Sequence, residues 1–253
     1  MKSMQNADWT KTGTLLAVAL AFAVPGCSTM PKSGQLEPRR GDEIVAAGKF
    51  FHTGTPVVLW TLFLFAIPAA SFALTNLLSG LGRDYGASER MVGLVMGGGV
   101  TVAGVAGSLA MPRLIRGRSP RLLYVAVGAA GAAFTLVLAF LPHTPGTFVL
   151  AVLGENLFQA AAFAVSTTIA LVTIGERNPL AATQFALLYA AMNLPQSYMQ
   201  ALDGAAYGIR GLSGALVTDA LVSLLACGVA ALLLRNIESH ALVLNPIQEL
   251  SGS

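Results

Sequence analysis

The sequence predicts an all-α membrane protein, a polytopic helical bundle, on three observations. Only 11% of the 253 residues are charged and 55% are hydrophobic, whereas about a quarter of the residues in soluble domains are charged. So few charges cannot cover the surface of a soluble globule, and disordered chains have the opposite composition. The apolar runs are also too long, and too lacking in alternation, to be strands of a membrane barrel.

Seven runs with few or no charges are long enough to be spans, since a span needs about 20 apolar residues. The first lies at residues 12–28, within an N-terminal segment of residues 1–29, and a polar linker occupies residues 30–55. The other six lie within residues 56–235, at 56–79, 91–111, 122–141, 147–173, 182–208 and 211–234. Turn-forming residues such as Gly80, Gly82 and Pro142 separate several runs. Residues 236–253 are then a tail.

The Lys and Arg residues between the runs predict the orientation. Ten of the 15 fall, by parity, on one side of the membrane and five on the other. The connection after the third run is especially basic, with Arg113, Arg116, Arg118 and Arg121. Because the side richer in Lys and Arg is normally cytoplasmic, we expect a multi-pass protein of the cell inner membrane with a cytoplasmic C-terminus. The N-terminus is then outside, which would be natural for the later part of a longer chain.

The N-terminal run has a second interpretation. Residues 15–24, followed by Pro25, Gly26, Cys27 and Ser28, resemble a lipoprotein signal in which Cys27 is acylated. Cleavage there would reverse every later span and place the four clustered arginines outside, against the charge rule. The segment before the run is also weakly basic, because Asp8 lies between Lys2 and Lys11. An ordinary helix is therefore the favoured interpretation, and lipidation of Cys27 stays open.

Polar side chains inside two neighbouring spans are the candidate functional residues. In the run 147–173, Glu155 and Gln159 are four residues apart and share a helical face, next to Asn156. In the run 182–208, intervals of three, four and three place four residues along one stripe: Asn193, Gln196, Gln200 and Asp203. Two adjacent polar stripes indicate a cavity between helices, and Pro195 is expected to kink the second helix.

A charged group in the bilayer is costly and usually functional, so Glu155 is a candidate to carry protons or contact a solute. Each of these polar residues could instead be structural or solvated. Glu155 could lie close to a membrane face, Asp203 and Asp219 could be solvated near their loops, and the amides could simply join helices.

The remaining chemistry-bearing residues exclude several classes of protein. His52, His143 and His240 lie far apart in loops or the tail, and two cysteines cannot build a disulfide scaffold or a four-ligand metal site. No phosphate-binding glycine loop occurs. A net charge of +3 is too small to indicate nucleic-acid binding. We therefore expect no enzyme activity, cofactor, metal site or nucleic-acid partner. The expected partners are the lipid bilayer, a small-molecule solute and protons.

Three short segments resemble a known family. They are Gly154-Glu155-Asn156-Leu157-Phe158, Ala182-Thr183-Gln184-Phe185-Ala186-Leu187-Leu188 and Asn193-Leu194-Pro195. Together they resemble the AmpG-type muropeptide permeases of the major facilitator superfamily, and related acetyl-CoA transporters share the pattern. The wider resemblance covers residues 56–234 and corresponds to the C-terminal six-helix half of that fold, with residues 12–28 as the preceding helix. Gln196 stands where the family often has Arg, and Met111 where the superfamily loop has an acid.

The resemblance implies proton-coupled uptake of anhydromuropeptides or similar amphipathic solutes, by symport across the inner membrane. It also implies that Glu155, Asn156 and Gln159 line the cavity from one helix, and Asn193, Gln196 and Gln200 from the next. Because such transporters rock one half against the other, a six-helix half would need a separate N-terminal half or a second copy. The alternative is a non-transporting membrane subunit or a truncated relic of such a permease.

Overall fold

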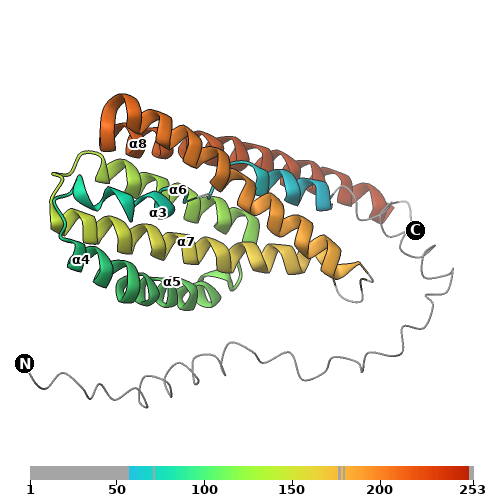
Figure 1. The fold of residues 1–253 in the computed structure, drawn as a ribbon. Helices are drawn as coiled ribbons and strands as arrows, with labels where there is room; N and C mark the ends of the chain where they lie inside the picture. The colour runs from blue at the N-terminus through green and yellow to red at the C-terminus, as the bar shows by residue number, and fades with distance from the viewer. Residues whose placement is uncertain (1–56, 71, 176–177, 179, 251–253) are drawn as a thin grey trace, which may run out of the picture. The chain divides into compact units, whose positions relative to one another are not determined.

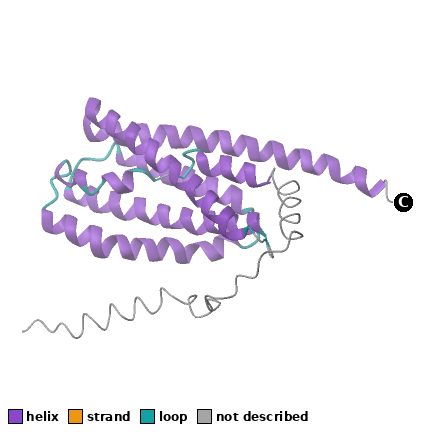
Figure 2. Ribbon diagram, turned by 45° about the vertical axis from the view of Figure 1, so that its right-hand side comes forward, coloured by secondary structure: helices purple, strands orange, loops and turns teal. Residues whose placement is uncertain are grey.

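The computed structural model describes residues 57–70, 72–175, 178 and 180–250, with side chains up to residue 235. The expected first span at 12–28, the linker at 30–55 and Cys27 lie outside these residues. The described part contains helices and no strand (Figures 1 and 2). Its elements are a helix at Val57–Ala66, α3 (Leu74–Leu77), η2 (Gly80–Arg83), α4 (Glu89–Leu94), the π-turn η3 (Val95–Gly99), α5 (Val100–Ile115), α6 (Pro120–Leu138), α7 (Pro145–Ile174) and α8 (Ala181–Leu250).

Four helical stretches are long and apolar enough to cross a membrane. They are Glu89–Ile115, Pro120–Leu138, Pro145–Ile174 and Ala181–Arg235. The protein is therefore a multi-pass helical membrane protein in its described part. Several helix ends follow from the sequence: Thr144 caps α7 by accepting a bond from the Thr147 amide at 3.3 Å, Pro145 opens that helix, and Gly175, with a φ of 72°, closes it.

The last of these stretches is a helical hairpin. Gly211 has φ 63° and ψ −154°, and it is the one residue of α8 with non-helical backbone angles. The chain reverses direction there (Figure 1), so the first arm, residues 181–210, runs antiparallel to the second arm, which starts at residue 212. This agrees with the predicted spans at 182–208 and 211–234. Pro195 keeps helical backbone angles, so the turn lies at Gly211, and the helix also continues through the expected tail to Leu250.

The predicted span at residues 56–79 is not one helix. Helix Val57–Ala66 stops, the described residues up to Ala73 are not helical, and Phe72 has a positive φ of 47°. Pro68 within this break has no backbone amide to donate. Side chains from both arms of α8 bond to the free carbonyls: Tyr198 donates to Ala66 at 2.9 Å, and the Cys227 thiol donates to Ala69 at 3.0 Å. We call residues 67–70, 72 and 73 the broken segment.

Helix α7 lies between α5 and α6, and α6 also packs on α8. Two buried apolar cores result. The turn-side core includes Tyr85, Leu138, Phe148, Val152, Leu212 and Leu216. The broken-segment core includes Phe65, Phe72, Tyr124, Ile169, Leu188 and Cys227. Some polar residues of α7 and α8 lie beside the turn-side core, and others lie beside the broken-segment core.

Candidate functional site

Glu155 lies near the middle of α7 and is only 1% exposed. Its Oε1 accepts a hydrogen bond from the Thr135 hydroxyl on α6, while its Oε2 is buried without a partner. The helix register explains why Glu155 points toward the protein interior, because it follows Ala151 and Val152 on the face of α7 that is buried in the turn-side core. Its burial shows that Glu155 is enclosed by protein side chains rather than by solvent.

Asp203 and Asp219 face each other across the α8 hairpin. Asp203 is eight residues before Gly211 (211 − 203) and Asp219 is eight residues after it (219 − 211). At 1.5 Å per residue, both lie about 12 Å from the turn, and their exposures are 0% and 3%. The two arms approach closely, since a Cβ on Gly214 would lie 2.5 Å from the carbonyl oxygen of Ala206. The suggestion that these two carboxylates are solvated near their loops is therefore wrong.

The two aspartates lack donors when both are ionised. Both oxygens of Asp203 and the Oδ1 of Asp219 are then buried without a hydrogen-bond partner. The hairpin register nevertheless places the two carboxyl groups at the same level on closely packed arms. A carboxyl group donates only when protonated, so one proton on the pair supplies the missing donor.

Glu155 and Asp219 each follow, by about one helical turn, two members of the turn-side core: Ala151 and Val152 on α7, and Ala215 and Leu216 on α8. We call Glu155, Asp203 and Asp219 the carboxyl trio. It is contributed by α7 and by both arms of α8, and the Thr135 bond ties it to α6.

Tyr85 joins the turn-side core from the turn between η2 and α4. Its ring packs against His143 and Phe148, with centroids 5.6 and 5.8 Å away, and its hydroxyl is buried without a partner. Burial raises the pKa of Tyr85 to about 12, and the charges of Glu155 and Asp84 add to the effect. The Tyr85 hydroxyl therefore keeps its proton at physiological pH and remains a potential donor.

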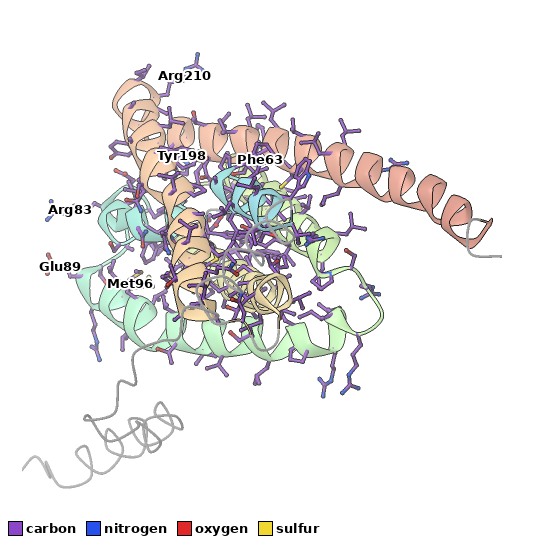
Figure 3. All side chains as sticks on the ribbon, turned by 90° about the vertical axis from the view of Figure 1, so that its right-hand side faces the viewer. Phe63, Arg83, Glu89, Met96, Tyr198 and Arg210 are labelled. Atoms are coloured by element: carbon purple, nitrogen blue, oxygen red, sulfur yellow. The ribbon has the colours of Figure 1, made fainter. Side chains whose placement is uncertain are left out.

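No described cation neutralises the trio. The described residues contain no lysine, and their arginines are exposed or partly exposed. Figure 3 shows Arg83 and Arg210 pointing away from the bundle, as Glu89 does. Among the residues that the structure describes, no group of three His, Cys, Asp or Glu side chains is arranged to hold a metal ion.

The predicted amide residues divide into two groups. Asn156 and Asn193 bond to their own helices, donating at 2.8 Å to the carbonyls of Val152 and Tyr189. Gln159 and Gln196, by contrast, line one small cavity of about 10 Å³, close to the room of a single water molecule, with Tyr124 and Ser166. Gln159 also donates to the Thr75 hydroxyl at 2.9 Å, just after the broken segment. Gln200 is half-buried. We call Gln159 and Gln196 the amide pair.

Sequence reasoning named Asp219 but left it out of the candidate site, and it missed Thr135 and Tyr85. Asp219 carries a signal that could have found it, because its distance from Gly211 equals that of Asp203. Thr135 and Tyr85 carry none: threonines are common in apolar spans, and Tyr85 lies in a loop whose path depends on packing.

Comparison with protein-family models, with curated proteins and with solved structures yields no match. The function of the chain therefore has to be inferred from the geometry of its described residues and from the sequence resemblance.

Proposed function

We propose that the protein is a secondary transporter of the AmpG type, which imports anhydromuropeptides or similar amphipathic solutes together with protons across the inner membrane. Residues 56–235 would form one half of the transporter and would work with a separate N-terminal half or a second copy. The sequence resemblance at Glu155 and Asn156, at residues 182–188 and at residues 193–195 supports the family.

One observation carries the proposal: the carboxyl trio is buried without a described cation. A single ionisable side chain at the centre of a bilayer costs about 3 kcal/mol or more. Packing does not need such groups, because apolar or amide side chains fill the same space at lower cost. Three carboxyls from three helical segments are therefore best explained by protons that enter and leave during transport.

The amide pair supports binding of an amphipathic solute. Amide groups both donate and accept hydrogen bonds, so they suit the uncharged hydroxyl and amide groups of a sugar-peptide. Gln196 in place of a family Arg fits contact with an uncharged part of such a solute. The broken segment beside this pair resembles the discontinuous helices that flank binding sites in other transporters.

Uptake in cells tests the proposal. The protein, expressed in a strain without its own muropeptide permease together with an N-terminal half if one is encoded nearby, should restore muropeptide-dependent cell-wall recycling. Glu155→Gln should remove the pH dependence of uptake without changing membrane insertion. Asp84→Asn is the matched control, because Asp84 is an exposed carboxylate bonded to the Tyr207 hydroxyl at 2.8 Å. Failure of uptake despite stable insertion of both halves would contradict transport.

The orientation is tested separately. Reporter fusions at Ser119 and His143 should show the first site in the cytoplasm and the second outside, with a cytoplasmic C-terminus. The reverse result would support the lipoprotein topology with acylated Cys27.

A non-transporting membrane subunit, or a relic of a permease, is the second candidate. It is favoured by the outward side of Glu89–Ile115, where Gly93, Gly97 and Gly104 have open space beside them. Small residues at such spacings permit close helix contacts. The two candidates differ in the reading frames upstream of the Met1 codon: an encoded five-helix segment there would favour the transporter.

A further inference from the structure

The register of the α8 hairpin forces Asp203 and Asp219 together. In an antiparallel hairpin, residues equally far from the turn lie at the same level, and these two are eight residues from Gly211 on either side. The close approach of Gly214 to Ala206 shows that the arms touch between the turn and the aspartates. Leu212, Ala215 and Leu216 beside them are at most 5% exposed, so water does not separate the pair from its apolar surroundings.

The elements packed around the two aspartates contribute the following titratable and hydroxyl groups. Helix α7 contributes Glu155, and the turn before α4 contributes Tyr85 and the exposed Asp84, which binds Tyr207 of the first arm. Helix α6 contributes Thr135, which does not titrate. His143, in the turn before α7, packs on the Tyr85 ring and is exposed. The described neighbours therefore provide further acids and hydroxyl groups, but no Lys or Arg that would stabilise two ionised aspartates.

Tyr85 is a further buried polar group without a partner in the turn-side core. Its hydroxyl belongs to a side chain with 0% exposure, has no partner, and lies where the charge of Glu155 acts on it. A buried hydroxyl without a bond costs about 1–3 kcal/mol.

A proton fits this site better than a metal ion. A cation needs several oxygens converging on one point, and the described side chains offer no such group of three. A proton needs only two neighbouring carboxyls, and the hairpin register brings the buried Asp203 and Asp219 to the same level.

We propose that the carboxyl trio is a proton-binding site in which Asp203 and Asp219 share one proton across the α8 hairpin. This inference rests on the proposed function, because the site would hold the proton that is transported with the solute. The site is tested by detecting a protonated carboxyl and the function is tested by uptake, so the two proposals can fail separately.

Infrared spectroscopy of the purified full chain in lipid tests the site. The wild-type protein at neutral pH should show the C=O stretch of a protonated carboxyl, which shifts in D₂O and on isotope labelling of aspartate. Asp203→Asn and Asp219→Asn should each remove this band, because an amide then donates the bond that the proton provided. Asp84→Asn should leave it unchanged.

Three results would overturn the site. They are a wild-type protein without the band at neutral pH, a band that shifts with labelled glutamate alone, and a band that persists in both aspartate variants. If either variant fails to fold, the labelling of the wild-type protein still decides. Loss of the wild-type band in sodium chloride but not in choline chloride would identify a sodium site and contradict a proton site.

Discussion

The carboxyl trio and the amide pair lie in the same bundle and draw on the same helices, yet their surroundings differ. The trio lies beside the turn-side core, with four carboxylate oxygens lacking partners when ionised. The amide pair lies beside the broken-segment core, where Gln159 bonds to Thr75 and the nearby carbonyls are bonded by Tyr198 and Cys227. The trio therefore contains ionisable groups that lack hydrogen-bond donors, whereas the polar groups around the amide pair are uncharged and hydrogen-bonded.

The difference shows how to separate function from packing among buried polar residues. A neutral amide is accommodated by one or two hydrogen bonds, each worth about 1 kcal/mol net. A buried carboxylate without a cation is destabilising by far more. Unmatched charge is therefore the better sign of function, and matched amides contribute to assembly and to solute contact.

The largest effect is expected from a substitution at Gly128, which packs against the broken segment beside the amide pair. A Cβ there would overlap the carbonyl oxygen of Ala69, in the broken segment. Gly128→Val should prevent correct packing of α6 on that segment, with a loss of about 3 kcal/mol or more. Size-exclusion chromatography in detergent should show aggregated protein. Gly104→Val is the control, because Gly104 has open space, and similar behaviour of both variants would contradict the close packing.

Thr135→Val should have the next largest effect, and it acts on the carboxyl trio. It removes the one described donor to Glu155 and should lower the free energy of unfolding by about 1–3 kcal/mol. Thr101→Val is the matched control, because the Thr101 hydroxyl is exposed and bonds only within its own helix, to Gly97 at 2.9 Å. Thermal unfolding in detergent compares the melting temperatures of the two variants with that of the wild type. Equal melting temperatures would show that the Thr135 bond does not stabilise the protein.

Smaller effects are expected among the amides. Gln159→Met should cost about 1 kcal/mol because it removes the bond to Thr75, whereas Asn193→Ala, which loses a bond within its own helix, should change stability by less than about 0.5 kcal/mol. The same unfolding assay measures both. A larger loss for Asn193 would mean that the two amide groups have been assigned the wrong roles.

Much of the bundle was predictable because apolar run length and turn residues are local signals. The spans at 91–111, 122–141 and 147–173 each overlap a helix, and the turn between the last two spans occurs at Gly211. The broken segment was not predictable, since it depends on Tyr198 and Cys227, more than a hundred residues away in sequence.

The site was predictable in part. Burial of Asp203 with Asp219 follows from their equal distances to Gly211, but only once the hairpin turn is located at that residue. Tyr85 and Thr135 join the site through tertiary packing that no spacing encodes. The permease resemblance stays a prediction, because the described helices fit a membrane bundle without specifying one family.

A double-mutant cycle on Asp203→Asn and Asp219→Asn tests the central claim, that the buried carboxyls act as one unit, most directly. The free energy of unfolding in detergent would be measured at alkaline pH for the wild type, both single variants and the double variant. We predict that either single change removes the repulsion, so that the double variant gains little more and the coupling exceeds about 0.5 kcal/mol. Additivity of the two changes within about 0.3–0.5 kcal/mol would show that the two aspartates do not interact, and would contradict a shared proton.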